Sequence, residues 1–144
     1  MKIVKKEKGF TLIELLIVVA IIGILASVVL ALLTTAKKKG EDSGIRTQMT
    51  SLRSEAELYA IANGNSYNNL FTGNNTWASI NTNIQNILTY INKQTAVHTA
   101  GSSTNQWAVQ AQLKEDPTNY VCVDYTATMK IGTVVLNAGD TVCP

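Results

Sequence analysis

The sequence predicts an α+β fold, in which a long N-terminal helix with an apolar first half packs on a small antiparallel sheet, with a connecting helix and a C-terminal disulfide. Three features of the 144-residue chain predict this fold. Residues 15–33 form an apolar run without charge. Apolar residues recur at helical spacing over residues 45–59 and 77–93. From Trp107 to Lys114, apolar and polar residues alternate as they do in a strand.

The chain opens with a short basic segment followed by the apolar run. Four lysines against one glutamate give residues 1–9 a side-chain charge of 4 − 1 = +3, which on the positive-inside rule holds this end in the cytoplasm. As a helix, the 19-residue run spans about 28 Å, close to the thickness of a bilayer core. Near its start lies Glu14, which without a partner costs on the order of 3 kcal/mol in lipid.

Three interpretations of this segment compete. A cleaved secretory signal requires a shorter run, and the downstream candidate cleavage site, residues 34–36, is weak. A plain membrane anchor fits the length but leaves Glu14 unexplained. The third interpretation rests on the residues around Gly9. The sequence Lys-Gly-Phe-Thr-Leu-Ile-Glu-Leu-Leu, residues 8–16, resembles the processing motif of type IV prepilins and of the related type II secretion pseudopilins.

The resemblance is strongest over residues 5–33, and it implies a processing pathway. A membrane-embedded prepilin peptidase is expected to cut between Gly9 and Phe10, and Phe10 is then expected to be N-methylated. The implied organisation is a cleaved leader (1–9), a hydrophobic transmembrane and assembly helix (10–36), and a globular head (37–144) that includes the amphipathic half of the long helix. Many members of the family carry a proline midway along this helix, where this chain has Ala31, so the family's kink is in doubt here.

Glu14 gains a role under this interpretation. After cleavage the chain begins with the cationic amine of Phe10, and in a bundle of parallel helices Glu14 of one subunit can pair with the Phe10 amine of its neighbour. Pairing two charges in an apolar medium offsets much of their desolvation. The pair is therefore expected to hold filament subunits in axial register. The alternative is a carboxylate that reaches toward the lipid headgroups.

Beyond the apolar run, Lys37-Lys38-Lys39 is expected to be a solvated anchor at headgroup level. Gly40 and Gly44 predict a flexible joint and a break in the helix. The helical period then returns from Ile45 to Tyr59, and Asn63-Gly64 predicts the C-terminal end.

A second helix is expected from Trp77 to about Lys93, capped by Thr76, with its isoleucines facing inward. Residues 100–105 are expected to be a polar connector. A half-buried strand at 107–114, a turn at 116–119, a strand at 120–125, and a third strand at either 129–131 or 132–136 then complete an antiparallel meander.

The two cysteines, Cys122 and Cys143, are not in a CxxC arrangement. In an exported domain an even cysteine count favours a disulfide, whereas in a cytosolic protein it favours two unrelated thiols. Because the apolar segment indicates export, we expect a Cys122–Cys143 bridge.

No motif for an enzyme, cofactor or metal is present, so the sequence predicts no enzyme, cofactor or metal site. His98 is the only histidine and is expected to lie at the surface. Asp116, Asp124 and Asp140 match no calcium loop, and turn or surface roles are expected for them. Without its first nine residues the chain has a side-chain charge of −1, which gives nucleic-acid binding no support without excluding it.

The leading hypothesis is a pilin, a structural subunit of a type IV pilus-like filament. Its expected partners are identical or related pilin subunits, the prepilin peptidase, the pilus assembly machinery and, before assembly, the inner membrane. The precursor is expected to cross the cytoplasmic membrane once, and the product is expected in an extracellular pilus or a periplasmic pseudopilus. The alternatives are a pseudopilin of a type II secretion or DNA-uptake machine and a membrane-anchored extracytoplasmic binding module.

Overall fold

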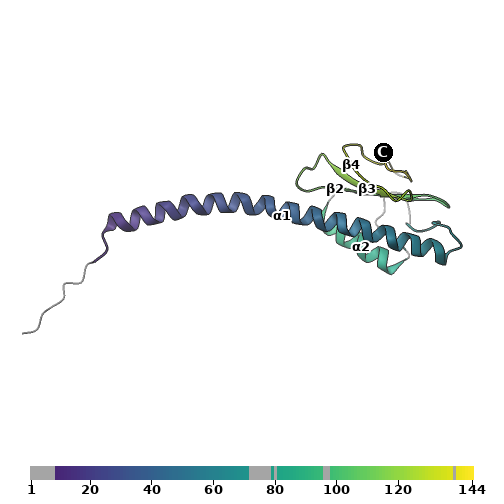
Figure 1. Ribbon diagram of the computed structural model, residues 1–144, viewed down its shortest axis with the longest axis horizontal. Coiled ribbons are helices and arrows are strands. Elements are labelled where there is room, and N and C mark those ends of the chain that lie inside the picture. Colours follow the sequence, from purple (N-terminus) through teal and green to yellow (C-terminus); the bar gives the residue numbers. More distant parts are fainter. Residues whose placement is uncertain (1–8, 72–78, 80, 96–97, 138) are drawn as a thin grey trace, which may run out of the picture. The chain divides into compact units, whose positions relative to one another are not determined.

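The computed structural model of the protein describes residues 9–71, 79, 81–95, 98–137 and 139–144 (Figure 1). The chain divides between Lys37 and Lys38 into two compact units, which are described separately below. The predicted α+β class and its antiparallel sheet are confirmed. The elements in chain order are α1 (Leu12–Ala62), α2 (Thr82–Gln94), β1 (His98–Ser102), β2 (Trp107–Gln112), β3 (Tyr120–Asp124) and β4 (Met129–Gly132).

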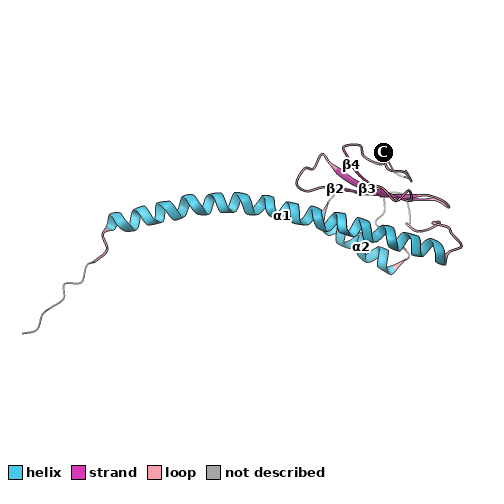
Figure 2. Ribbon diagram, in the orientation of Figure 1, coloured by secondary structure: helices cyan, strands magenta, loops and turns pink. Residues whose placement is uncertain are grey.

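The expected break in α1 at Gly40 and Gly44 is wrong, because the helix continues through both glycines (Figure 2). A Cβ atom at Gly44 would lie 2.5 Å from the Tyr90 hydroxyl oxygen of α2, so a larger residue here would require the Tyr90 side chain to shift. At its C-terminal end α1 stops at Ala62, as predicted. Gly64 adopts a φ of 70°, and the Asn65 N–H donates to the Ala60 carbonyl at 2.8 Å, which closes the last turn.

The second helix begins later than expected. Its first residue is Thr82 rather than Trp77, and Asn81 is the cap, with its side-chain oxygen accepting the N–H groups of Asn83 and Ile84 at 2.9 and 3.2 Å. The expected start, including the predicted cap Thr76, lies outside the described residues. The inward-facing apolar side chains Ile84, Leu88 and Ile91 are fully buried, as the periodicity predicts.

The four strands form one antiparallel sheet in the order β1-β2-β3-β4, which confirms the meander. The expected polar connector at 100–105 is partly wrong. Residues 98–102 are β1, which pairs along its whole length with β2. Of the two positions considered for the third predicted strand, the first holds, because β4 ends at Gly132.

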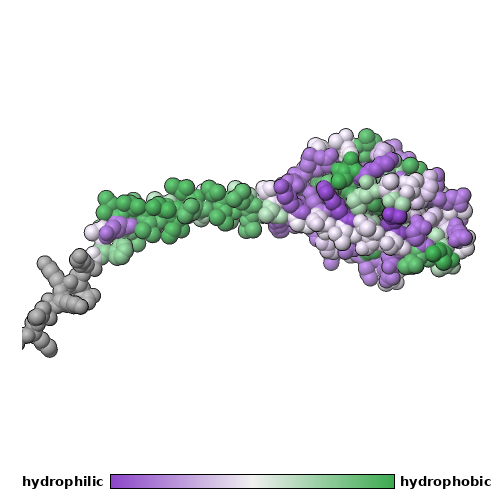
Figure 3. Space-filling view, viewed as in Figure 1, coloured by the Kyte–Doolittle hydropathy of each residue, from purple (hydrophilic) through white to green (hydrophobic). Residues whose placement is uncertain are grey.

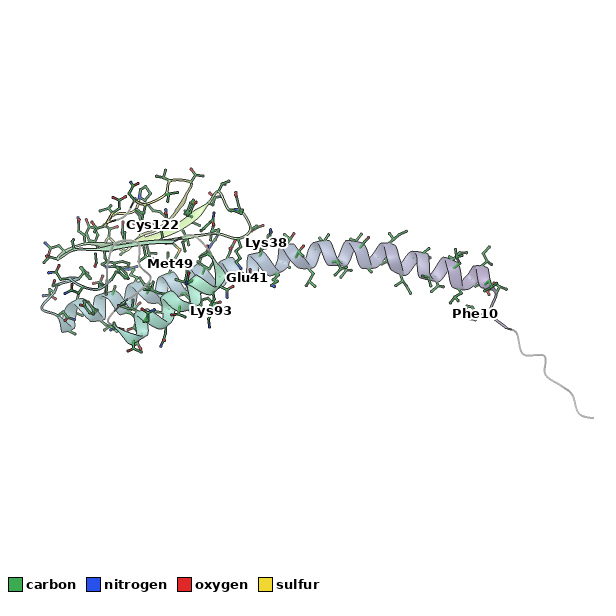
Figure 4. All side chains as sticks on the ribbon, turned by 180° about the vertical axis from the view of Figure 1, so that it is seen from behind. Phe10, Lys38, Glu41, Met49, Lys93 and Cys122 are labelled. Atoms are coloured by element: carbon green, nitrogen blue, oxygen red, sulfur yellow. A yellow bond between two sulfur atoms is a disulfide. The ribbon has the colours of Figure 1, made fainter. Side chains whose placement is uncertain are left out.

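The main core lies between one face of the sheet and the two helices, and Met49 of α1 lies in it (Figure 4). The expectation that β2 is half-buried is wrong, since Ala108 and Gln110 on its other face are also buried. The reason is that residues 133–144, which we call the C-terminal strap, cover this face. Ala108 and Cys122 form a second buried cluster there with Leu136 and Cys143 of the strap.

Candidate processing and assembly segment

The predicted processing site lies just outside the long helix. Gly9 and Phe10 are both exposed, with Phe10 82% accessible, and α1 begins only at Leu12. A Cβ atom at Gly9 would meet nothing within 4 Å. The peptide bond between Gly9 and Phe10 is therefore accessible in non-helical backbone. The basic residues of the predicted leader lie outside the described residues.

Glu14 takes part in a capping box with Thr11. The Thr11 N–H and hydroxyl both donate to Glu14 Oε2, at 2.9 and 2.8 Å, and the Glu14 N–H donates to Thr11 Oγ1 at 3.3 Å. Thr11 is thus the N-cap of α1 and Glu14 its third helical residue, and each satisfies a backbone donor of the other. The predicted partner of Glu14, an amine of a neighbouring subunit, is a separate contact that a single chain does not form.

The first unit presents apolar side chains on all sides of the helix. Its large hydrophobic residues from Leu12 to Leu33 have exposed fractions between 46% and 88%. Figure 3 shows a largely apolar surface on the visible face of this segment, with a hydrophilic patch near its N-terminal end. By length and composition α1 could cross a membrane. An apolar surface of this extent requires a lipid or protein environment.

At the lysine-rich end of this segment, Lys39 forms an ion pair with Glu115 of the loop between β2 and β3, with Nζ and Oε1 3.3 Å apart. Glu41 forms a second pair with Lys114 of the same loop at 3.1 Å. Lys38 and Glu41 are labelled close together on α1 in Figure 4. The three lysines were expected to be solvated, but Lys39 is paired with a residue of the head.

The predicted disulfide is confirmed. Cys122 of β3 is bonded to Cys143 of the C-terminal strap, with their Cα atoms 5.8 Å apart. Hydrogen bonds also hold the strap, among them one from the Thr141 hydroxyl to Gln106 Oε1 at 3.0 Å. The Cys143 N–H donates to Asp124 Oδ2 at 2.9 Å, Lys130 Nζ donates to the Cys143 carbonyl at 3.0 Å, and the side-chain amide of Gln110 bridges two strap residues.

The three aspartates considered as calcium ligands are used within the fold. Asp116 accepts from Thr118 in the β2–β3 turn, buried Asp124 accepts from Thr126 and from the strap, and Asp140 accepts the N–H of Asn137. Among the described residues, no group of three or more potential metal ligands comes together. The side chain of His98, predicted to lie at the surface, is outside the described set.

Two side chains of the head have shifted pKa values. The hydroxyl and the backbone N–H of Thr118 hydrogen-bond to Asp116, which lowers the pKa of that carboxyl below its ordinary value. Burial raises the pKa of Tyr67, and its hydrogen bond to the Glu57 carboxylate raises it further. Tyr67 is half-buried and packs against Trp107 at the edge of the core, with ring centroids 6.4 Å apart.

Sequence reasoning missed three residues that the structure shows to be important. Thr11 was identifiable from its position three residues before Glu14, which is the spacing of a capping box. Asp42, a carboxylate that is only 4% exposed, and Gln110, an amide that is 2% exposed, had no such signal. Their partners lie 72 and 24 residues away in the chain.

The comparison with protein families bears directly on this segment. The chain carries the prokaryotic N-terminal methylation motif, over residues 4–34. A 63-residue stretch of it is 46% identical to the type IV wide pilus major component PilA4 of Thermus thermophilus, covering 44% of this chain and 47% of that protein. Over 63 residues it is also 38% identical to the type II secretion system core protein G of Vibrio cholerae, covering 44% of this chain and 43% of that protein.

A fimbrial protein of Pseudomonas aeruginosa is 50% identical over 58 residues, which are 40% of this chain and 33% of that protein. The predicted resemblance to type IV pilins and type II secretion pseudopilins is thus confirmed. The chain spans less than half the length of each of these relatives. No solved structure matches it significantly.

Proposed function

We propose that this protein is a pilin, a structural subunit of a type IV pilus-like filament that is processed after Gly9 and assembled through its apolar helix. The observation that carries the proposal is the combination of the N-terminal methylation motif with a helix whose apolar side chains are exposed on every side. Before assembly this surface lies in the inner membrane, and after assembly it packs against other subunits.

In this proposal the prepilin peptidase cuts between Gly9 and Phe10, on the cytoplasmic side, and Phe10 is N-methylated. The head, with its sheet and disulfide, supplies the filament surface and has a structural rather than an enzymatic role. Residues 10–36 are the assembly helix. Glu14 pairs with the Phe10 amine of a neighbouring subunit and sets the axial register.

Mass analysis of the mature N-terminus tests the processing step. The expected chain begins at N-methylated Phe10, and a chain that begins at Met1 or at Lys37 would refute it. Variants of Glu14 test the register contact. Glu14→Ala leaves the Phe10 amine unpaired in an apolar environment, so filament yield should fall by roughly a hundredfold while cleavage continues.

Glu14→Gln is the matched control for charge. It keeps an oxygen that can accept from Thr11 but cannot neutralise an amine. If Glu14 only caps the helix, the glutamine variant should assemble as the wild type does. If the charge pair sets the register, it should fail as Glu14→Ala does.

A pseudopilin is the second candidate, and the match to type II secretion system core protein G favours it. Both candidates require the same processing and assembly steps. Electron microscopy of filaments sheared from the cell surface separates them, since a pilus is extracellular and a pseudopilus remains periplasmic.

A further inference from the structure

The first buried residue of α1 carries a charge. Every described residue from Gly9 to Gly40 is exposed and Glu41 is half-buried, whereas Asp42 is 4% exposed. Placing an ionised carboxylate inside a protein is unfavourable unless it is paired or hydrogen-bonded. Buried Asp42 therefore needs hydrogen-bond or ion-pair partners, and the structure provides them.

Both oxygens of Asp42 accept backbone N–H groups from the loop between β2 and β3. The Lys114 N–H donates to Oδ1 at 2.7 Å and the Glu115 N–H to Oδ2 at 3.0 Å. The side chains of the same two loop residues pair with Glu41 and Lys39 of the same helical turn, at 3.1 and 3.3 Å. We call this set of five residues the Asp42 latch.

The segment that the latch holds is intrinsically a poor helix. Gly40 and Gly44 lie on either side of Asp42, and only proline is less favourable than glycine inside a helix. Packing against the Tyr90 side chain favours glycine at position 44. It does not explain Gly40, because a Cβ atom there would meet nothing within 4 Å, so alanine would fit and would favour the helix.

We propose that the Asp42 latch is a conformational switch in α1. With the latch closed, residues 38–44 are helical, and with the latch open, the two glycines turn this segment into a hinge at the edge of the head. Gly40 keeps the open state accessible, since nothing else in the packing requires it. The inference does not depend on the proposed function.

Asp42 is the dominant part of the latch. The flanking ion pairs are partly exposed, with 61% and 45% of the Lys39 and Glu115 side chains accessible, and pairs of this kind contribute little and are screened by salt. The two hydrogen bonds to buried Asp42 are charge-assisted and shielded from solvent. Removing this single carboxylate should therefore open the latch.

Hydrogen exchange of the full chain in detergent micelles tests the proposal. In Asp42→Ala, amides 40–46 should exchange about tenfold or more faster, because the loss of hydrogen bonds to a charged group lowers local protection. Amides of β2 and β3 should be unchanged. Adding Gly40→Ala to this variant should bring the exchange of amides 40–46 back to within about threefold of the wild type.

Asp116→Asn is the matched control. It alters a carboxylate in the same loop whose oxygens accept from Thr118 and Asn119 of its own turn, so exchange of amides 40–46 should not rise more than exchange in β2 and β3. The proposal is refuted if Asp42→Ala leaves amides 40–46 as in the wild type. It is also refuted if exchange rises equally in β2 and β3, which would make Asp42 a general fold anchor, or if Gly40→Ala fails to restore protection.

Discussion

Replacing both cysteines by alanine should destabilise the head without releasing the C-terminal strap. Cys122 and Cys143 are 21 residues apart in sequence, and in the chain-entropy model a loop of this length contributes about 3 kcal/mol, mainly by restricting the unfolded chain. Alanine suits both positions because the sulfur atoms lie in an apolar cluster, where a serine hydroxyl would lack a partner.

The native strap should stay in place in this variant because hydrogen bonds from the rest of the head also hold it. These connect Asp124 and Lys130 to residue 143, Gln110 to Val134 and Leu136, and Gln106 to Thr141, at distances of 2.7 to 3.0 Å. The structure therefore predicts a loss of about 3 kcal/mol in the free energy of unfolding with little change in the exchange of strap amides under native conditions.

Urea titration of the full chain in detergent, followed by the emission of buried Trp107 in a Trp77→Phe background, measures this change. A reducing agent should reproduce it in the cysteine-containing chain and have no effect on the alanine variant. A loss below about 1 kcal/mol would refute the chain-entropy argument. Fast exchange of the strap amides with an otherwise stable core would show instead that the disulfide holds the strap in the native state.

Three further changes give expected outcomes in the same titration. Gln110→Leu removes the two hydrogen bonds from this buried amide to the Val134 carbonyl and the Leu136 N–H and should cost about 1–3 kcal/mol; a cost under about 0.5 kcal/mol would contradict this role. Ala127→Gly should stabilise the chain by about 0.5–1 kcal/mol, because Ala127 has a φ of 76°, and a destabilised variant would count against the strain. Folding lowers the pKa of Asp116 from 3.8. The ionised carboxylate therefore stabilises the folded state above pH 3.8, and this stabilisation is lost as the pH falls through the pKa of Asp116 in the folded protein. Asp116→Asn should therefore be less stable than the wild type at pH 7, and the two stability curves should converge in acid; a constant difference would contradict the assignment.

The parts of the fold that depend on local sequence were predictable. The apolar run, the 3.6-residue period from Ile45 to Tyr59 and the Asn63-Gly64 end gave α1, because these signals act within a few residues. The residues of the disulfide followed from the expectation of export together with a pair of cysteines. The turn at 116–119 followed from the side chains that cap it.

Two of the errors share one physical cause, which is contact with a distant part of the chain. Gly40 and Gly44 predicted a break in α1 because glycine has a low helix propensity. The helix nevertheless continues, and Asp42 between the two glycines is hydrogen-bonded to a loop 72 residues away. The β2 strand was expected to be half-buried because the polar residues at alternate positions indicated that one face of the strand is exposed to solvent. Gln110 instead meets a strap more than 20 residues further on, which no alternation in β2 could reveal.

The capping box changes the energetic argument about Glu14. The sequence suggested that this carboxylate is costly in lipid until a neighbouring subunit supplies a charge. In the structure Thr11 already donates two hydrogen bonds to Oε2, and no described residue donates to Oε1. Under the proposed function, one oxygen of the Glu14 carboxylate is thus already hydrogen-bonded while the subunit lies in the membrane before assembly. The other oxygen remains for the Phe10 amine of the next subunit. Assembly then adds a contact to Glu14 without first breaking one, so the register contact can form without the helix losing its cap.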